Sequence, residues 1–475
     1  MSEKLRRLAG SVWFITLVAL TLRLVVVAFE YHGQLNPRRD HWPFGYETGR
    51  IARAIATGRG FSDPVTVGSG PTAWMTPVYP YLVAGVFKLF GIYSTASAVI
   101  LLSLNSLFSA LTCIPVFLMT RDSFGEKTAF WAGWSWALFP YAIYFSAEWI
   151  WETCLTTLLL SLLFLITLRL ERSTVLKSWV GYGLLWGITA LSDPAVLSLL
   201  PLLVGWVCYR LHKRGRRSGL QVVVAVVALA VVVTPWFVRN YRTFHHFIPF
   251  RDAFWLVMHV GNNGDTSHWA PDAAHPSANV KEEQEYNRLG ELNYMAEKRR
   301  EVIEFIRSHP GWYIGMMFRR FVYTWTGFWS LPVNGRLHEP LDPEELFDPL
   351  NIAFCASLTA LAITGLCLAF RRDLATAWPY ALALLGFPAV YYLTTTDLRY
   401  RHPIDPELLA LAAYACATFF SKQQEAPQKV TRRTRSAKRR LRRPPLYNPW
   451  HSSLAASWAH KPSFLNPISR PTAVR

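Results

Sequence analysis

The sequence predicts an all-α protein that crosses a membrane about ten times, because of its composition, its apolar blocks and its distribution of charge. Of its 475 residues, 52% are hydrophobic, and the chain contains 20 Trp, 20 Tyr and 29 Phe. Its apolar blocks approach the roughly 20 residues that span a bilayer. These blocks are 12–29, 98–119, 153–168, 221–236, 352–370 and 377–393. They lack the amphipathic period of a soluble helix, as expected where lipid faces most sides of a helix.

The positive charge lies mostly in short segments between the apolar blocks and in the tail, at 429–443. The formal net charge is +18. An excess of Lys and Arg in cytoplasmic loops is typical of membrane proteins. The charge therefore indicates topology and gives no reason to expect a nucleic-acid partner. We expect the tail at 421–475, which is rich in Pro, Ser and Arg, to be disordered and to contact anionic lipid headgroups.

The most basic loops assign the two sides of the membrane. The cluster at 212–217 is the strongest cytoplasmic signal, and it leaves 30–97 and 239–348 as the large external segments. Roughly ten spans then place both termini in the cytoplasm. The expected spans are 12–29, 98–119, 129–145, 150–168, 179–191, 195–208, 220–236, 352–370, 377–393 and 404–420. An eleventh apolar run, 78–90, would break this parity, so we interpret it as an interfacial or re-entrant helix.

The first apolar run is interpreted as a retained anchor rather than a signal peptide. It is long, contains Arg23 and lacks a clear small-residue cleavage site. All six cysteines lie inside apolar blocks without metal-ligand spacing, so neither a metal site nor a disulfide framework is expected from them.

The first external loop carries an unusual concentration of polar residues. Its pattern predicts a short helix at the membrane surface, with Glu47, Arg50 and Arg53 pointing away from an apolar face. That face is formed by Ile51, Ala52, Ile55 and Ala56. Simple docking at the interface explains the pattern equally well.

Several short segments, taken in order, resemble a known family. They are Glu47 followed by IARAIATGRGFS at 51–62, PTAWMTPVYPY at 71–81, Glu152 at the start of a span, PWFVRNY at 235–241 leading to GNN at 261–263, and RYRHPIDP at 399–406. Together they resemble the bacterial GT-C glycosyltransferases, in particular the ArnT-like and protein-mannosyltransferase-like families. The resemblance extends from the N-terminus to about Phe420.

The resemblance implies a GT-C-like transmembrane domain over 1–420 in a bacterial inner membrane, with its external loops in the periplasm. It also implies a reaction. An inverting transferase of this kind moves a sugar from a polyprenyl-phosphate carrier to an acceptor hydroxyl on a lipid, a glycan or a protein. The implied partners are the lipid-linked donor, that periplasmic acceptor and the surrounding lipids.

Such a transfer needs a carboxylate base within reach of the acceptor hydroxyl. The resemblance places the base in the first external loop, where Glu47 is the first candidate and Asp40 the second. The usual aspartate of the family would lie one helical turn before Glu47, where this chain has Phe44. Residues three apart share a helix face, so Glu47 could serve. Alternatively, these acids pair with Arg39 or Arg50.

The departing phosphate needs positive charge and hydrogen-bond donors, which arginine is well suited to supply. Cationic groups at the outer ends of spans are therefore candidates, although arginines at an interface also snorkel to headgroups. The predicted substrate-binding residues are Arg239, Asn240, Arg399, Arg401, His402, Glu148, Glu152 and Tyr79.

Acidic residues near membrane depth are costly and suggest function. Glu148 and Glu152 are expected to share a helix face at the outer mouth of a span, where they could orient an acceptor, bind a divalent ion or pair with an arginine. Arg23 could pair with an acid such as Glu152 or snorkel outward. Asp193, which precedes Pro194, is expected to cap a helix.

A divalent cation is conceivable among Asp40, Glu47, Glu148 and Glu152, but no ligand spacing requires one. Two other function classes remain open. A glycan ligase or polymerase with a lipid-pyrophosphate donor would need similar phosphate-binding residues. A lipid or sugar transporter would instead show polar residues near the middle of several spans, or internal repeats, whereas the polar groups here gather on one side.

Overall fold

The computed structural model describes residues 9–34, 44–147, 150–264, 266, 274–327 and 348–420. Over these ranges the chain is helical, and its β-structure is one isolated antiparallel bridge between Ser62 and Pro71. The predicted all-α class is therefore confirmed. The chain divides into a unit of Met1–Phe420 and a second unit of Ser421–Arg475. All described residues belong to the first unit, and the following account concerns that unit alone.

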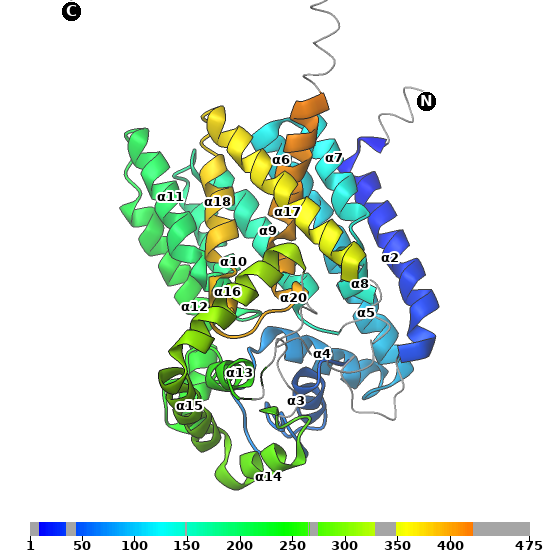
Figure 1. Ribbon diagram of the computed structural model, residues 1–475, viewed down its shortest axis with the longest axis vertical. Coiled ribbons are helices and arrows are strands. Elements are labelled where there is room, and N and C mark those ends of the chain that lie inside the picture. Colours follow the sequence, from blue (N-terminus) through cyan, green and yellow to red (C-terminus); the bar gives the residue numbers. More distant parts are fainter. Residues whose placement is uncertain are drawn as a thin grey trace, which may run out of the picture. The chain divides into compact units, whose positions relative to one another are not determined.

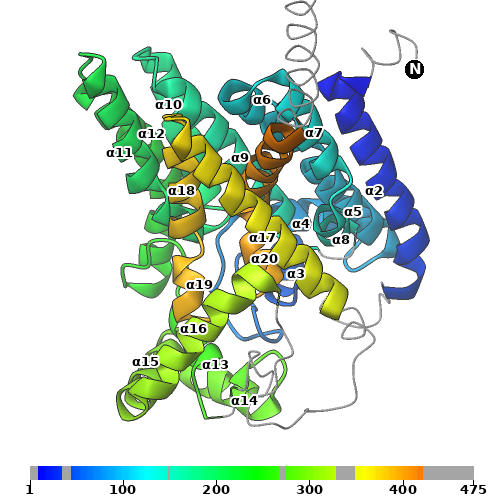
Figure 2. The ribbon, with the colours of Figure 1, turned by 45° about the horizontal axis from the view of Figure 1, so that its top comes forward.

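The apolar blocks form a bundle of long helices that run roughly side by side (Figures 1 and 2). Six stretches of the described residues are long and apolar enough to cross a membrane: Val12–Phe29, Thr95–Phe124, Thr153–Leu170, Pro194–Lys213, Gly219–Phe244 and Leu350–Arg371. The main bundle helices are α2 (Val12–Gln34), α5 (Thr95–Leu111), α6 (Cys113–Phe124), α9 (Thr153–Leu170), α10 (Leu176–Ala190), α11 (Leu200–Lys213), α12 (Gly219–Phe244) and α17 (Asp348–Arg371). The start of α2 and the end of the helical segment at 405–420 lie at the same end of the bundle (Figure 1).

Proline interrupts two of the other expected spans. The run at 129–145 is divided into α7 (Glu126–Ala137) and α8 (Pro140–Ala147), and the run at 377–393 into α18 (Ala377–Gly386) and α19 (Ala389–Leu393), next to Pro388. Proline has no backbone N–H and disfavours helical geometry in the residue before it. Apolar composition therefore located these segments, while proline determined where their helices break.

Two glycines on one face of α10 allow it to pack closely against α12. A Cβ atom added at Gly183 would lie 2.1 Å from the backbone oxygen of Ala225, and one added at Gly187 would lie 2.6 Å from Cβ of Val232. Small residues four apart let helix backbones approach in this way. The close approach fixes the first half and the middle of α12 against α10, and the C-terminal end of α12 leads into the region beside the cavity described below.

A second layer of helices covers the end of the bundle away from the start of α2 (Figure 1). It contains α3 (Glu47–Ala56), α4 (Val78–Phe90), α13 (Phe254–Gly261), α14 (Val280–Leu289), α15 (Glu291–Ser308) and α16 (Pro310–Thr326). In Figure 1, α4 lies across the end of the bundle rather than along it. This arrangement suits the interfacial or re-entrant helix that we expected at 78–90.

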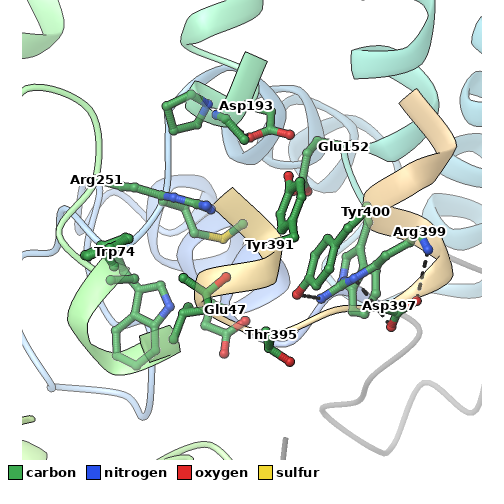
Figure 3. Close-up of a pocket in the computed structure, with 18 of the residues that line it drawn as sticks. Glu47, Trp74, Glu152, Asp193, Arg251, Tyr391, Thr395, Asp397, Arg399 and Tyr400 are labelled. Carbon is green, nitrogen blue, oxygen red and sulfur yellow. Dashed lines mark hydrogen bonds and ion pairs between the residues drawn. The ribbon is translucent and has the colours of Figure 1, made fainter. Parts of the chain in front are cut away.

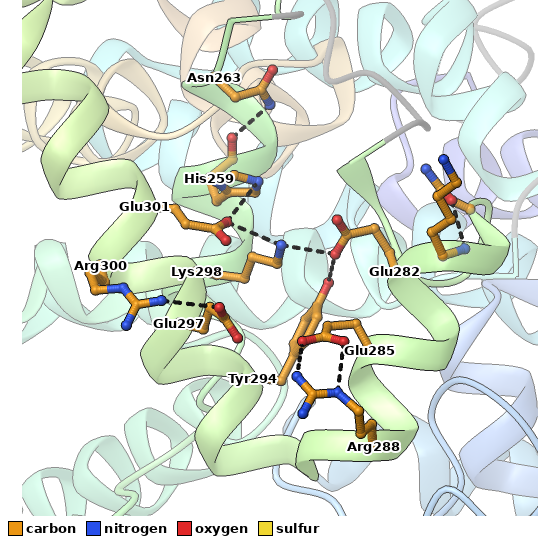
Figure 4. A network of polar contacts seen from close by, with 12 residues as sticks. His259, Asn263, Glu282, Glu285, Arg288, Tyr294, Glu297, Lys298, Arg300 and Glu301 are labelled. Carbon is orange, nitrogen blue, oxygen red and sulfur yellow. Dashed lines mark hydrogen bonds and ion pairs between the residues drawn. The ribbon is translucent and has the colours of Figure 1, made fainter.

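A polar network joins α13, α14 and α15 within this second layer (Figure 4). Lys298 is almost fully buried, and its Nζ lies 2.9 Å from Oε2 of Glu282 and 3.1 Å from Oε2 of Glu301. The hydroxyl of Tyr294 donates to Glu282 at 2.6 Å, and Nε2 of His259 lies 3.6 Å from Glu301. A buried ammonium group with two carboxylate partners retains its charge at a tolerable cost. The network therefore holds α13, α14 and α15 together.

Arg23 is fully buried inside the bundle, and it neither pairs with Glu152 nor snorkels outward. Its guanidinium donates to Oγ of Ser109 at 2.9 Å and to the backbone oxygens of Ala19, Trp136 and Ala137 at 3.0–3.2 Å. Both alternatives expected from the sequence are therefore wrong. The reason is that a bend in the neighbouring chain, between α7 and α8, exposes carbonyl groups that a guanidinium fork can reach.

Candidate active site

A cavity of about 460 Å³ lies where the second layer meets the bundle. Its walls come from the start of α3, the start of α9, the turn at Asp193–Ala195, the chain before α13, and the segment between α19 and α20 (Leu398–Arg401). Figure 3 shows Glu47, Glu152, Arg251 and Arg399 around this space. The cavity therefore collects acids and arginines from distant parts of the sequence, together with several aromatic rings.

Glu47 lines the cavity from the first turn of α3, where a carboxylate is favoured by the helix dipole. Its Oε1 accepts a hydrogen bond from Oγ of Ser277 at 3.2 Å, and Nε2 of His275 lies 3.4 Å from the same oxygen. Nη1 of Arg50 donates to Oγ of Ser277 at 3.0 Å. The Glu47 side chain is 17% exposed. The carboxylate is thus held on one side by groups from the large external segment, while the cavity remains accessible to it.

The entry to α3 depends on Gly45. Its φ angle is +68°, in the region that favours glycine, and a Cβ atom there would lie 2.3 Å from Cδ1 of Trp151. Phe44, at the position of the family's usual aspartate, is buried and packs against Tyr93 and Phe87. The residue that reaches the cavity is therefore Glu47, one turn later.

Glu152 forms the N-cap of α9 at the wall of the cavity. Burial raises the pKa of its carboxyl group, the nearby Asp193 raises it further, and Arg399 and Arg251 oppose that shift. Asp193 caps the following turn as expected, because its Oδ1 accepts the backbone N–H of Ala195 at 3.0 Å. The cavity thus has an acidic wall close to two arginines.

Arg399 also lines the cavity and is held by aromatic and acidic groups. Its guanidinium carbon is 3.5 Å from the centre of the Trp151 ring, and Nη2 donates to the hydroxyl of Tyr400 at 2.9 Å. Asp397 accepts the backbone N–H of Arg399 at 2.9 Å, and its other oxygen is 3.9 Å from Nε. Burial by itself lowers the pKa of Arg399, but the charges of Tyr400, Asp397 and Glu152 outweigh burial and raise it. The group is a permanent cation beside the cavity.

Three of the predicted binding residues do not line the cavity. Arg239 donates to the backbone oxygens of Phe61 at 2.7 Å and of Thr72, and Nδ2 of Asn240 donates to the backbone oxygen of Ile248 at 3.0 Å. The hydroxyl of Tyr79 donates to Oδ1 of Asn105 at 3.0 Å. These side chains satisfy carbonyl groups of nearby loops and helices.

Arg401 and His402 also point away from the cavity, although they follow Arg399 directly. Both are buried and both contact Asp405: Nε of Arg401 at 3.0 Å and Nδ1 of His402 at 3.1 Å. His402 is further stacked on Trp136. Of these three predicted residues only Arg399 therefore lines the cavity: Arg401, two residues later on α20, faces another direction, and His402 begins the next helical turn, where Asp405 binds both.

Two predicted residues, Asp40 and Glu148, lie outside the described residues. Among the residues that are described, no group of three or more His, Cys, Asp or Glu side chains is arranged to hold a metal ion. The conceivable cation site among Asp40, Glu47, Glu148 and Glu152 therefore gains no support from the described part of the chain.

The sequence reasoning missed several groups that line the cavity. They are Trp74, Trp151, Asp193 as a wall residue, Arg251, His275, Ser277, Tyr391, Asp397 and Tyr400. Trp74 and Tyr400 lie within the motifs at 71–81 and 399–406, so those motifs gave a signal for them. Arg251 and His275 follow irregular segments with no periodic pattern, so only the tertiary fold brings them to the cavity.

Part of the chain matches a known family. Residues 73–237 match the model of the family described as dolichyl-phosphate-mannose-protein mannosyltransferase. This segment includes Trp74, Trp151, Glu152 and Asp193, but it ends before Arg251 and Arg399. No curated protein sequence matches the chain.

The structure is similar to solved membrane proteins. The archaeal oligosaccharyltransferase AglB from Archaeoglobus fulgidus, in complex with an inhibitory peptide and a dolichol-phosphate, has 15% sequence identity and a TM-score of 0.55, covering 88% of this chain and 52% of that protein. The oligosaccharyltransferase of the same organism tethered to an acceptor peptide gives 16% identity and a TM-score of 0.53, over 86% of this chain and 50% of that one. The chain thus spans about half the length of these proteins.

A third structure, ArnT from Cupriavidus metallidurans bound to undecaprenyl phosphate, has 14% identity and a TM-score of 0.37, over 85% of this chain and 77% of that one. At that score the overlap supports no structural argument. The match to the oligosaccharyltransferase does support one, and it agrees with the order of motifs along the sequence. The chain therefore shares its fold with about half of that archaeal membrane protein.

Proposed function

We propose that this protein transfers a sugar from a polyprenyl-phosphate carrier to the hydroxyl group of an acceptor. The observation that carries the proposal is that a carboxylate, Glu47, and a permanent cation, Arg399, line one cavity at the end of a membrane bundle. A lipid-linked sugar presents its reactive carbon and its phosphate at such a surface. The aromatic rings of Trp74, Tyr391 and Tyr400 in the same cavity offer flat surfaces for a sugar ring.

In this reaction the acceptor oxygen attacks the anomeric carbon from the side opposite the phosphate. Its proton passes to the carboxylate of Glu47, which acts as general base. The bond between the anomeric carbon and the phosphate oxygen breaks, and polyprenyl phosphate leaves with the electron pair. One displacement of this kind inverts the configuration at the sugar. Arg399 and Arg251 supply the positive charge that the leaving phosphate requires.

The family model and the solved structures support the donor class. The family is described by its dolichyl-phosphate-mannose donor, and the archaeal oligosaccharyltransferase was solved with dolichol-phosphate and a peptide. In our proposal the cavity end faces the periplasm of a bacterial inner membrane, and both termini are cytoplasmic. The basic loop at 212–217, which follows α11, supports that orientation.

The test is transfer of radiolabelled sugar by the purified full-length chain in lipid, with a polyprenyl-phosphate donor pool and an envelope lipid, glycan or peptide as acceptor. We expect transfer by the wild type and a loss of about 100- to 10,000-fold in Glu47→Gln, the range attributed to a general base. Glu304→Gln, at an exposed position on α15, is the matched control. Transfer only from lipid-pyrophosphate donors would favour the glycan ligase instead, and undiminished transfer by Glu47→Gln would remove the base assignment.

A further inference from the structure

We propose that His275 is a positioning residue for Glu47, and that it holds the carboxylate in place through its Nε2–H group. This inference rests on the proposed function, since it assigns a partner to the base. His275 lies in the large external segment, 228 residues after Glu47, yet both side chains line the cavity (275 − 47 = 228). The distance from Nε2 of His275 to Oε1 of Glu47 is 3.4 Å.

The surroundings of His275 determine which ring nitrogen carries the proton. Nδ1 accepts the backbone N–H of Ser277 at 3.1 Å, and a backbone amide is always a donor. In the neutral imidazole the proton must then be on Nε2, the nitrogen that faces Glu47. The local turn therefore selects the tautomer that donates to the carboxylate.

The ring is held in this orientation by the fold. The backbone oxygen of His275 accepts the N–H groups of Ala278 and Asn279 at 3.0 and 2.9 Å, which closes a compact turn before α14. The indole of Trp74 contacts the imidazole edge to face, with the ring centres 5.7 Å apart. A side chain fixed by both its own turn and a neighbouring ring can support a second side chain with little loss of entropy.

Ser277 completes the arrangement from the same turn. Its hydroxyl donates to Oε1 of Glu47 and accepts from Arg50. The Ser277 hydroxyl thus donates to Oε1 and His275 Nε2 lies against the same oxygen, while within the described ranges Oε2 of Glu47 accepts no hydrogen bond. Oε2 is therefore the oxygen that can receive the proton of the acceptor hydroxyl, while Oε1 anchors the carboxylate.

The expected effect of His275 is limited to orienting the Glu47 carboxylate. His275 gives up no proton during the transfer. Its N–H fixes the plane of the carboxylate relative to the cavity. Because the donor belongs to the turn at 274–279, the arrangement around Glu47 is complete only when that turn is docked against α3.

The first experiment compares His275→Leu with His275→Gln in the full-length protein. Leucine has no donor, whereas the glutamine amide can place an N–H near the same oxygen. We expect His275→Leu to lower kcat about 10- to 100-fold, as is typical of losing a hydrogen bond to a charged group, with KM for the donor changed less than about twofold. His275→Gln should recover most of kcat. His309→Leu, at an exposed position after α15, is the matched control and should retain wild-type rates.

Equal losses in the leucine and glutamine variants, or wild-type kcat in His275→Leu, would overturn the inference. A rise in KM alone would indicate substrate contact instead of positioning and would also overturn it.

The second experiment does not depend on transfer. In protein labelled with ¹⁵N-histidine, the signal absent from His275→Gln should report an Nε2-protonated ring and should shift in Glu47→Gln. A signal that reports the other tautomer, or that does not respond to Glu47→Gln, contradicts the pairing even if the wild type proves inactive. Absence of transfer by the wild type together with the expected signal would reject the proposed function but retain the contact.

Discussion

The cavity and the interior of the bundle both contain buried charged groups, but they use them differently. In the bundle, Arg23 is surrounded by one hydroxyl and three backbone oxygens, and Arg401 is paired with Asp405. In the cavity, Arg399 lies over an aromatic face beside open volume, and Glu47 is anchored through one oxygen. A charged group whose hydrogen-bonding positions are all occupied by the protein holds helices together. A charged group with open positions next to a cavity can bind a ligand. Variants at the two kinds of position should therefore fail differently.

The largest effect is expected from Arg401→Leu. Arg401 is almost fully buried and paired with Asp405, and its Nη1 also donates to the backbone oxygen of Thr324 at 3.1 Å. Removing it leaves the buried carboxylate of Asp405 with His402 as its remaining ionic partner among the described residues, and breaking a buried ion pair typically costs about 3–5 kcal/mol. Equilibrium unfolding in mixed micelles should show this loss, while transfer per folded molecule changes little. If the Arg401→Leu variant were stable but inactive, Arg401 would instead belong with the residues that act at the cavity.

Arg399→Leu should give the opposite pattern. We expect transfer to fall about 100- to 1,000-fold, the range seen when one group that stabilises developing charge is removed. The free energy of unfolding should change by less than about 1.5 kcal/mol, because the side chain is near the surface of the cavity. Steady-state rates and unfolding curves of the same preparation provide the comparison. A loss of stability equal to that of Arg401→Leu would remove the distinction between the two regions.

Arg239→Met tests a residue that the sequence placed at the substrate. Its bonds to the backbone oxygens of Phe61 and Thr72 hold the external loop at 61–72 against α12. Losing a charge-assisted hydrogen bond costs about 1.5–3 kcal/mol, so the melting temperature should fall and KM for the donor should be nearly unchanged. An increase in KM without a loss of stability would restore Arg239 to the binding site.

The smallest expected effect is a dependence of protein stability on pH, which arises from the buried carboxyl pair of Asp252 and Glu291 in the external region. Burial and the neighbouring Glu291 carboxyl raise the pKa of Asp252 well above its usual value. Burial also raises the pKa of Glu291, although Ala73, Thr72 and Tyr286 donate to it. The contact between the two carboxyl groups becomes a hydrogen bond only when one of them is protonated.

The folded protein therefore retains a proton that the unfolded chain releases above about pH 4. A rise in pH from there to the folded pKa must lower stability, by at most about 1.4 kcal/mol per pH unit for each proton. Asp252→Asn should flatten this dependence in melting temperatures measured from about pH 5 to 7. An unchanged slope would show that the pair does not hold the proton.

Much of the architecture could be predicted from the sequence because apolar blocks must become membrane helices. The breaks next to Pro140 and Pro388 were missed, since hydropathy alone does not register a missing backbone donor. For the site, the acid before an amphipathic helix led to Glu47, and the motif at 399–406 led to Arg399.

The rest of the site depends on side-chain direction and on long-range folding. Arg399 and Arg401 share a motif, yet only the first lines the cavity, because a short helix turns them apart. His275 and Arg251 reach the cavity through irregular segments of the external region, where neither a period nor a motif indicates their position. Such residues become visible only when the chain is folded.

The absence of a side chain at Gly45 has a consequence for the spacing of the reactive groups. Trp151 fits against that glycine on one side and carries the guanidinium of Arg399 on its ring. The indole of Trp151 therefore lies between the start of the helix that carries Glu47 and the guanidinium of Arg399, and its size sets their separation. A methyl group at position 45 would displace the Trp151 ring, and the guanidinium of Arg399 that is stacked on the ring would move with it. In the proposed reaction, the distance between the base and the cation is thus set by a glycine that contributes no functional group.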